Sequence, residues 1–332
     1  MNTARNVADH RYGRVEGAGR WDTKMIAGLY RRALLSVADA PPVSAFVKQQ
    51  GRKLGVSRFV AGEQLPEVLA AARTLRGNGL ESILDLLGEF VGAEADAAAM
   101  TDEVLATLES IRAEPGERYM SVKPTQLGLG VDFGLGLHNA RRVAEKAREV
   151  KAQLCLDMEN APYVDETLRL FRTLSEEGYL HVSTVLQSYL YRTMDDLNAL
   201  LELSPKPTLR IVKGAYREGD TVAFQDKAEV DRNFRELVYR GLEAGATVGV
   251  ATHDESIIRE TEAYVRGAGL GTERYEYQFL YGVKPALQRK LVSRGHKVRV
   301  YIPYGRDWYG YFSRRLAERP ANLLFVMRGL IG

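Results

Sequence analysis

Two consecutive arginines, Arg314 and Arg315, stand in a segment near the carboxyl end of the chain that reads DWYGYFSRRLAE. A helix turns about 100° per residue, so a helix here places Tyr311, both arginines and Glu318 on one arc of roughly 100°. A planar guanidinium matches a carboxylate through two parallel hydrogen bonds, and Glu318 can orient one arginine from behind. The spacing indicates a clamp for a small carboxylate ligand. The alternative is a solvent-exposed helix whose i,i+4 ion pairs contribute about 0.2–0.5 kcal/mol each.

A second group of cations stands in the segment RIVKGAYRE, where Arg210 and Lys213 bracket the end of an apolar run. Gly214 and Ala215 follow, and residues this small let backbone N–H groups approach an anion closely. Two cations beside exposed amides suit a phosphate or pyrophosphate, because charge-assisted hydrogen bonds are the strongest kind. A strand whose charged ends are solvated explains the same residues equally well. This segment alone does not separate the two explanations.

Several common catalytic signatures are absent from the sequence. It contains no G-x-x-x-x-G-K-[ST] phosphate loop, no G-x-S-x-G nucleophile elbow and no H-E-x-x-H zinc pair. The glycines of GLGVDFGLG, residues 128–136, lack the dinucleotide-binding spacing and predict a loop. Five histidines, none at ligand spacing, predict that there is no catalytic metal.

Composition excludes some classes of protein. With 45% hydrophobic and 27% charged residues, the chain has the balance of a globular protein with a sizeable core. A net charge of +3 without a basic block argues against nucleic acid as a partner. No apolar run approaches the roughly 20 residues that a membrane span needs. The single cysteine, Cys155, excludes an intrachain disulfide and suits a reducing cytoplasm.

The elements that would position these residues alternate regularly from residue 82 onward. The expected strands are Ser82–Leu87, Tyr119–Val122, Gln153–Leu156, His181–Leu186, Thr208–Val212, Thr247–Ala251, Tyr275–Phe279 and Lys297–Ile302. The expected helices are Asp102–Arg112, Asn139–Lys151, Val164–Glu177, Met194–Leu203, Asp231–Ala244, Glu255–Gly267, Lys284–Arg294 and Asp307–Glu318. Eight such units predict an α/β fold with a parallel sheet closed into a (β/α)8 barrel.

The region before the first strand has a different pattern. Apolar stripes at helical spacing run from Asp22 to about Asn78, and the last stripe ends at Gly77. We therefore expect a flexible leader over residues 1–21, an N-terminal helical segment over 22–79 and a barrel domain over 80–332.

Polar residues follow or occupy seven of the eight expected strands. They are Lys123, Asp157, Gln187, Arg210 with Lys213, Thr252 with His253, Glu276 with Gln278, and Tyr301 with Tyr304. The strand ends of a barrel converge on one mouth, where barrel enzymes place their catalytic groups. Strong donors and a carboxylate in seven successive positions are hard to explain as turn chemistry. The sequence therefore predicts an active site at this mouth.

With these segments together, the sequence resembles the monofunctional bacterial proline dehydrogenases from about Met25 to its end. The matching segments occur in the family's order: LDLLGEF, SVKPTQLGL, LDMEN, TVLQSYLYRT, RIVKGAYRE, ATHDE, YEYQFLYGV and VRVYIPYGRDWYGYFSRRLAERPAN. The resemblance implies a distorted (β/α)8 TIM barrel, preceded by helices, that binds FAD non-covalently. It implies oxidation of L-proline to Δ1-pyrroline-5-carboxylate by hydride transfer to flavin N5, the first step of proline catabolism. Electrons would then pass to a membrane quinone.

The resemblance also implies a cellular setting and roles for single residues. The protein would be cytoplasmic, able to lie at the inner face of the membrane and to contact pyrroline-5-carboxylate dehydrogenase transiently. Lys123, Asp157 and Arg210 would be catalytic. Arg314 and Arg315, with Lys123, would bind the proline carboxylate, oriented by Glu318 and walled by Tyr216, Leu280, Tyr301 and Tyr311. The flavin contacts would be Met158, Gln187, Arg210, Lys213, Gly214, Ala215, Thr252, His253 and Glu276.

Two other functions stay open from the residues alone. A barrel isomerase or aldolase could use Lys213 as a Schiff-base amine, or Arg210 and Lys213 as a phosphate site, on a phosphorylated or carbonyl substrate. A binding module could use the helix of Arg314 and Arg315 to dock an acidic partner or nucleic acid. The weak net charge counts against nucleic acid.

Overall fold

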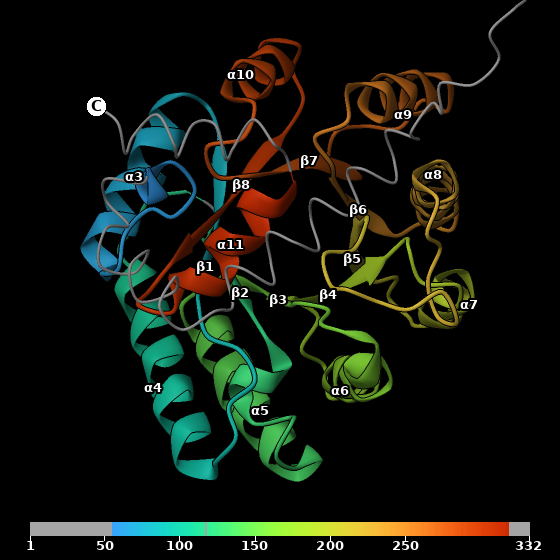
Figure 1. The fold of residues 1–332 in the computed structure, drawn as a ribbon. Helices are drawn as coiled ribbons and strands as arrows, with labels where there is room; N and C mark the ends of the chain where they lie inside the picture. Colours follow the sequence, from blue (N-terminus) through green and yellow to red (C-terminus); the bar gives the residue numbers. More distant parts are fainter. Residues whose placement is uncertain (1–54, 117, 319–332) are drawn as a thin grey trace, which may run out of the picture.

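The computed structural model describes residues 55–116 and 118–318, and within these ranges a closed barrel of parallel strands forms the centre of the fold (Figure 1). The strands pair in chain order, and the last one closes the barrel on the first. They are β1 (Glu81–Leu86), β2 (Arg118–Val122), β3 (Ala152–Leu156), β4 (Val182–Gln187), β5 (Thr208–Val212), β6 (Thr247–Ala251), β7 (Tyr275–Leu280) and β8 (Val298–Tyr304). The predicted barrel is confirmed, with every strand boundary within two residues of the expected one.

Helices surround this barrel. They are α3 (Leu65–Gly77), α4 (Glu94–Ile111), α5 (Phe133–Glu149), α6 (Val164–Glu176), α7 (Thr193–Leu200), α8 (Lys227–Glu243), α9 (Glu255–Gly267), α10 (Pro285–Ser293) and α11 (Trp308–Glu318). Short 3-10 turns stand at Val56–Arg58, Pro124–Leu127 and Ala161–Tyr163. Helix α3 confirms the last of the expected N-terminal stripes. The leader (1–21) and residues 22–54 of the expected helical segment lie outside the described residues.

Three helices begin well before the expected residue. Helix α8 starts at Lys227, four residues before the predicted start, where the Asp226 carboxylate accepts a hydrogen bond from the Ala228 amide and caps the helix. Helix α4 starts at Glu94, eight residues before the predicted start, because its first turns are rich in alanine, which favours a helix without giving an apolar stripe. Helix α5 starts at Phe133 because the Asp132 carboxylate accepts a hydrogen bond from the Leu135 amide and caps it. The loop predicted over residues 128–136 was therefore wrong beyond Asp132. Gly136 lies inside the helix, where a Cβ would come within 2.9 Å of the Leu129 backbone.

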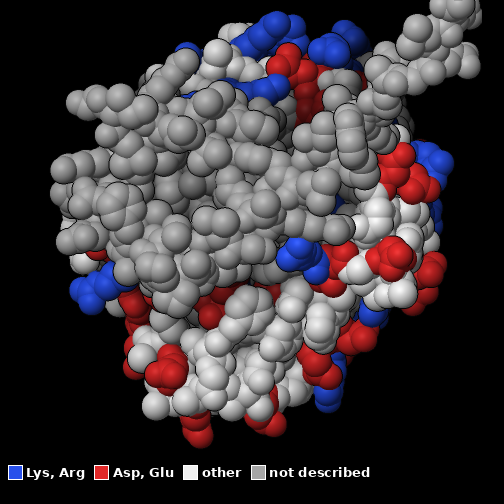
Figure 2. Space-filling model, in the orientation of Figure 1, with Lys and Arg blue, Asp and Glu red and all other residues white. Residues whose placement is uncertain are grey.

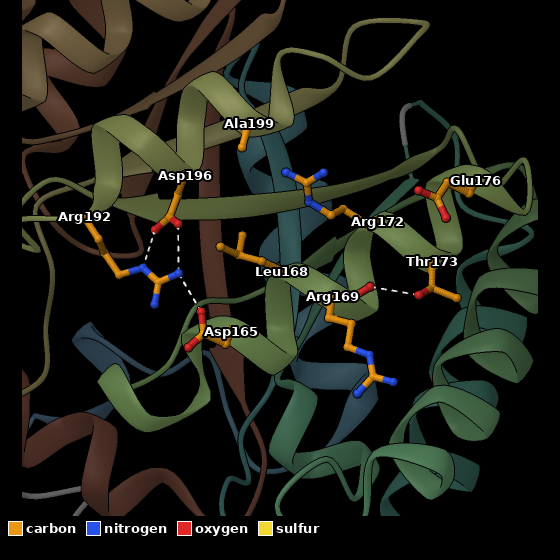
Figure 3. A pocket seen from close by; sticks show the side chains of 9 residues that line it. All are labelled: Asp165, Leu168, Arg169, Arg172, Thr173, Glu176, Arg192, Asp196 and Ala199. Carbon is orange, nitrogen blue, oxygen red and sulfur yellow. Dashed lines mark hydrogen bonds and ion pairs between the residues drawn. The ribbon is translucent and has the colours of Figure 1, made fainter.

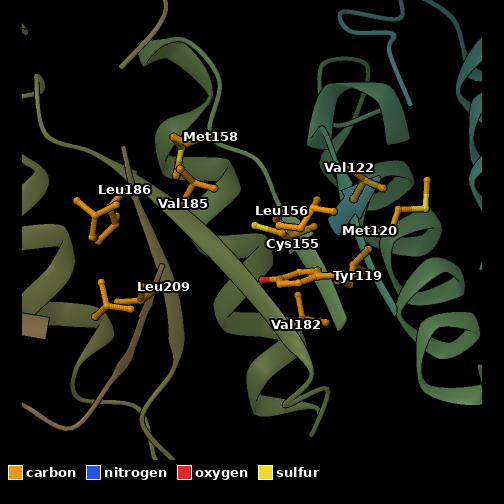
Figure 4. Close-up of a cluster of buried hydrophobic side chains, with 14 of the residues drawn as sticks. Tyr119, Met120, Val122, Cys155, Leu156, Met158, Val182, Val185, Leu186 and Leu209 are labelled. Atoms are coloured by element: carbon orange, nitrogen blue, oxygen red, sulfur yellow. The ribbon is translucent and has the colours of Figure 1, made fainter. Parts of the chain in front are cut away.

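The wall of the barrel separates two kinds of side chain. Met120, Val122 and Leu156 on the outward face pack against the surrounding helices as part of the continuous apolar core (Figure 4). The opposite face of the same strands carries Ser121 and Cys155 toward the barrel axis, because side chains alternate along a strand. The barrel is thus apolar outside and largely polar inside. On the face shown in Figure 2, acidic and basic side chains both occur around the edge of the described surface.

None of the helices within the described residues is both long enough and apolar enough to cross a membrane.

The apolar layer gives a direct test of stability. Leu154 on β3 is completely buried, so Leu154→Ala should lower the free energy of unfolding by about 2–5 kcal/mol through lost burial and a residual cavity. Urea unfolding followed by circular dichroism measures the change. The control is Leu180→Ala, because Leu180 is 56% exposed and its loss should change stability by no more than about 0.5 kcal/mol. Equal effects of the two substitutions would contradict the placement of the core.

Candidate active site

A cavity of about 910 Å³ opens at the carboxyl ends of the strands. Apart from Tyr304, Glu276 and Glu318, the structure brings every predicted site residue to its lining. These residues are Lys123, Asp157, Met158, Gln187, Arg210, Lys213, Gly214, Ala215, Tyr216, Thr252, His253, Leu280, Tyr301, Tyr311, Arg314 and Arg315. They come from loops and strands far apart in the sequence, and from α11. The predicted convergence at one mouth is therefore observed. The prediction was wrong for Tyr304, because its hydroxyl lies 2.6 Å from that of Thr107 on α4.

Charged side chains of alternating sign cross the floor of this cavity. The Lys123 ammonium lies 2.8 Å from an oxygen of Asp85 and 3.6 Å from an oxygen of Asp157. Asp157 also accepts a hydrogen bond of 2.7 Å from Arg210 and one of 2.6 Å from the Tyr301 hydroxyl. All four charged groups are buried. Each charge therefore has an opposite charge beside it, which burial requires.

The pKa values of these charged groups follow from their burial and from the opposite charges beside them. Burial alone would raise the pKa of Asp157, but Arg210 and Lys123 together hold it below its ordinary value. Burial alone would lower the pKa of Lys123, but Asp85 and Asp157 raise it above its ordinary value. Burial raises the pKa of Asp85 to about 6, although Lys123 acts in the opposite direction. Lys123 and Asp157 therefore stay charged around neutral pH.

One side-chain nitrogen of Arg210 is a buried donor without a hydrogen-bond partner among the described residues. The Arg210 Nε donates to the Gln278 side chain at 2.7 Å, and its Nη1 donates to Asp157 at 2.7 Å. Its Nη2 is buried without a hydrogen-bond partner among the described residues. Because Arg210 lines the cavity and a buried donor needs an acceptor, this nitrogen fits a ligand with an electron-rich atom.

The loop after β5 approaches the cavity closely. Gly214 has a φ of +112°, and a Cβ there would lie 2.3 Å from the ring of Tyr189, so only glycine fits. The Lys213 ammonium is shared between Asp231 at 2.5 Å and Asp254 at 3.3 Å. Lys227 lines the cavity beside them, which sequence reasoning did not predict.

The arginine pair of α11 lines the other side. The Arg314 Nη1 forms an ion pair of 2.7 Å with Glu89, which also accepts a hydrogen bond of 3.2 Å from the Tyr216 hydroxyl. The Arg315 guanidinium lies 5.1 Å from the ring centre of Tyr311. The described carboxylate beside the pair is thus Glu89, in the loop after β1. Glu318 ends α11, and its side chain lies outside the described part of the structure.

The family model described as proline dehydrogenase matches residues 68–328. This chain belongs to the proline dehydrogenase family. It is 47% identical over 311 residues to a proline dehydrogenase of Deinococcus radiodurans, covering 92% of this chain and 99% of that protein. It is 37% identical over 288 residues to proline dehydrogenase 2 of Bacillus subtilis, covering 87% and 94%.

The fold is shared with much longer chains. A structure of proline utilization A from Bdellovibrio bacteriovorus superposes with a TM-score of 0.77 at 21% identity. The match covers 88% of this chain but 37% of that one, so this proline dehydrogenase family member spans about a third of its length.

One predicted flavin contact does not reach the cavity of this family member. Glu276 lies two residues before Gln278 on β7, where its carboxylate is ion-paired with Arg299 at 2.7 Å. Gln278 lines the cavity instead, because it stands nearer the carboxyl end of the same face of the strand. The sequence pattern marks both positions but does not say how deep each one lies.

Two carboxylates of the site were missed. Asp85 is the only charged residue in the run SILDLL, and a lone carboxylate in a strand expected to be buried was the available signal. Glu89 follows that strand by three residues, and its place in the family-matching segment LDLLGEF was the available signal.

A second hollow lies on the outer surface between α6 and α7 (Figure 3). It measures about 420 Å³, and Arg192 within it pairs with Asp165 at 2.6 Å and with Asp196 at 2.8 Å. Three of its charged side chains are thus paired with one another, and the hollow shares no lining residue with the cavity at the strand ends.

Glu159 is a buried carboxyl group beside the site. It accepts hydrogen bonds from the Thr125 amide at 2.9 Å and the Thr125 hydroxyl at 2.6 Å. Burial raises the pKa of Glu159 to about 7, although the two bonds from Thr125 oppose the shift. The folded chain therefore binds a proton on Glu159 over a pH range in which the unfolded chain has lost it.

This proton predicts a pH dependence of stability. The pKa of Glu159 is higher in the folded chain than in the unfolded chain. Its contribution to the free energy of unfolding is therefore greatest below pH 4.5 and is lost as the pH rises to about 7. In Glu159→Gln this titration is absent, so the free energy of unfolding of the variant should rise relative to the parent across that window. Urea unfolding at a series of pH values measures the difference. A difference that is constant with pH would contradict the shift.

Proposed function

We propose that this chain is an FAD-dependent enzyme that oxidises L-proline to Δ1-pyrroline-5-carboxylate and passes the electrons to a quinone. The observation that carries the proposal is the Nη2 of Arg210, a buried donor without a partner in a cavity that also holds an arginine pair. A flavin would supply the acceptor that this nitrogen lacks, and an amino-acid carboxylate would suit the arginines. The cavity of about 910 Å³ lies within the usual range for cofactor sites.

The cofactor side would be formed by the strands on the Arg210 side of the cavity. Arg210 would stabilise negative charge on the flavin ring, and the loop of Gly214 and Ala215 would bring backbone close to it. Met158, Gln187, Lys213, Thr252 and His253 complete the proposed contacts and line the same cavity. When bound, the flavin accepts the hydride, and the protein supplies binding, orientation and electrostatics.

The substrate side would be formed by α11 and the residues facing it. Arg314 and Arg315 would bind the proline carboxylate together with Lys123. The rings of Tyr216, Tyr301 and Tyr311 and the side chain of Leu280 would enclose the pyrrolidine ring. Glu318 would orient one arginine. Glu89 already pairs with Arg314, so the substrate carboxylate would compete with it for the same guanidinium.

The charge states of Lys123 and Asp157 limit the roles that these two residues can have in the reaction. Lys123 and Asp157 stay charged around neutral pH, because each is flanked by opposite charge. We therefore assign them electrostatic and orienting roles rather than proton transfer. The substrate amine must lose its proton before hydride leaves the adjacent carbon, so activity should rise with pH.

The wider setting of the reaction is proposed from the family resemblance. The electron acceptor would be a membrane quinone, and the protein would work in the cytoplasm at the inner face of the membrane. Its product would pass to pyrroline-5-carboxylate dehydrogenase through transient contact. The isomerase or aldolase alternative is not favoured, because membership of the proline dehydrogenase family points to proline oxidation. An acidic or nucleic-acid partner at the α11 arginines is likewise not favoured, since both arginines line the cavity.

The visible spectrum tests this function. The purified protein, supplied with FAD, should retain a yellow chromophore through gel filtration. Anaerobic L-proline should bleach its absorption, because the hydride reduces the flavin. A chain that stays colourless in excess FAD, or a bound flavin that proline does not bleach, would contradict the proposal.

Substitution of one clamp arginine separates substrate binding from cofactor binding. Arg315→Met should raise the KM for proline about tenfold to a hundredfold, because a charge-assisted carboxylate contact is lost. Flavin content should stay normal. Steady-state kinetics and the protein-to-flavin absorbance ratio measure the two effects. The matched control is Arg232→Met, an exposed arginine of α8 that should leave the KM unchanged. Loss of flavin with an unchanged KM would refute the assigned role.

A further inference from the structure

Gln278 stands between the arginine that faces the proposed flavin and a buried ion pair deeper in the barrel. Its side-chain oxygen accepts the hydrogen bond of 2.7 Å from the Arg210 Nε, and its side-chain nitrogen donates to Glu276 at 2.8 Å. We propose that Gln278 is a positioning residue, which holds Arg210 in the orientation that binds the flavin. The proposal rests on the flavin function above.

The orientation of the Gln278 amide is fixed by chemistry. An arginine nitrogen only donates, so Arg210 must face the amide oxygen. The Glu276 carboxylate, which burial alone would protonate, has its pKa held below the ordinary value by Arg299, so it is ionised and only accepts. The amide nitrogen must therefore face Glu276. A flipped amide would set donor against donor and acceptor against acceptor.

The deep end of this chain of contacts is itself anchored. The Arg299 Nε donates to Glu276 at 2.7 Å, and its Nη2 donates to the other oxygen of that carboxylate at 3.0 Å. The Arg299 Nη1 also donates to the backbone oxygen of Ser82 at 3.1 Å. Arg299 is 1% exposed, so its guanidinium is held rigidly inside the barrel. The position of Glu276, and through it that of Gln278, is thus tied to β1 and β8.

The barrel provides space for the Gln278 amide at one glycine. Gly249 on β6 is the register partner of both Arg210 on β5 and Glu276 on β7. A Cβ at position 249 would lie 2.6 Å from the Gln278 side-chain nitrogen and 3.0 Å from its amide carbon. Any larger residue would push the amide from its place between the two charged groups.

The consequence is a division of tasks among the nitrogens of Arg210. Gln278 holds Nε and Asp157 holds Nη1, which leaves Nη2 as the donor to the ligand. Because Glu276 is neutralised by Arg299, the chain supplies Arg210 with a fixed direction rather than with additional charge. Because its partners already hold the Arg210 side chain in one orientation, that side chain loses little conformational freedom when the ligand binds.

Flavin affinity measures this role. In Gln278→Leu the Arg210 Nε loses its acceptor, so the Kd of the deflavinated protein for FAD, followed by quenching of flavin fluorescence, should rise about tenfold or more. Gly249→Ala should also raise this Kd, because it displaces the amide without removing it. The matched control is Gln288→Leu. Gln288 is a buried glutamine of α10 whose amide donates a hydrogen bond of 2.8 Å to the backbone oxygen of Val283, and neither residue lines the cavity. This substitution should leave the Kd unchanged.

A double-mutant cycle separates positioning from direct contact. If Gln278 acts through Arg210, Gln278→Leu in an Arg210→Met background should change the Kd for FAD less than about twofold. A full additional loss in that background would show that Gln278 binds the flavin itself and would overturn the proposal. An unchanged Kd in both Gln278→Leu and Gly249→Ala would overturn it as well. A parent protein that binds no FAD would instead overturn the proposed function.

Discussion

The site depends on opposite charges that compensate one another inside the barrel. Asp85, Lys123, Asp157 and Arg210 come from four different strands or strand ends, and no one of them is buried without an opposite charge close by. An uncompensated buried charge costs several kcal/mol, so removal of one member leaves its neighbour in an unfavourable state. The chain can be completed only when the strands that carry it stand around one axis. The site is therefore complete only in the closed barrel.

This arrangement explains why the interior of the barrel is polar while its outer face is apolar. The helices bury one face of each strand, and that burial supplies the free energy that holds the barrel together. The inner face is then free to carry groups that contribute little stability but fix positions. Arg299 is among the most deeply buried side chains, yet each of its three side-chain nitrogens donates to Glu276 or Ser82. Pairing of this kind keeps the interior rigid.

Much of the fold could be predicted because apolar periodicity reports burial directly. Most residues of the eight strands are buried, so their apolar runs stand out from the amphipathic helices between them. The starts of α4 and α5 were missed because alanine and glycine carry little periodic signal. Alanine propensity decides the first start, and the Asp132 cap decides the second.

The sequence predicted which residues lie at the site, but not which of them contact one another. The chemistry of strand ends identified Lys123, Asp157 and Arg210, because a barrel brings strand ends to one mouth. The partners could not be predicted in the same way. Glu89 meets Arg314 across 225 positions of sequence, and the depth of Glu276 relative to Gln278 depends on strand register. Contacts of this kind are set by the tilt and stagger of a closed barrel, which no local pattern records.

The two sides of the cavity differ in how tightly their charges are held. On the floor, the side chains of Lys123 and Arg210 are 7% and 6% exposed, and each pairs with carboxylates that are also buried. The Arg314–Glu89 pair is 22% and 19% exposed and joins a helix to a loop. A ligand carboxylate can replace Glu89 at Arg314 while the released Glu89 regains contact with water. The exchange therefore leaves no charge buried without a partner. The same exchange at Asp157 would leave a carboxylate buried without its cation. The rigid floor thus suits groups that keep one position, Arg210 toward the proposed cofactor and Lys123 toward the proposed substrate, and the partly exposed pair suits a substrate that enters and leaves with each turnover.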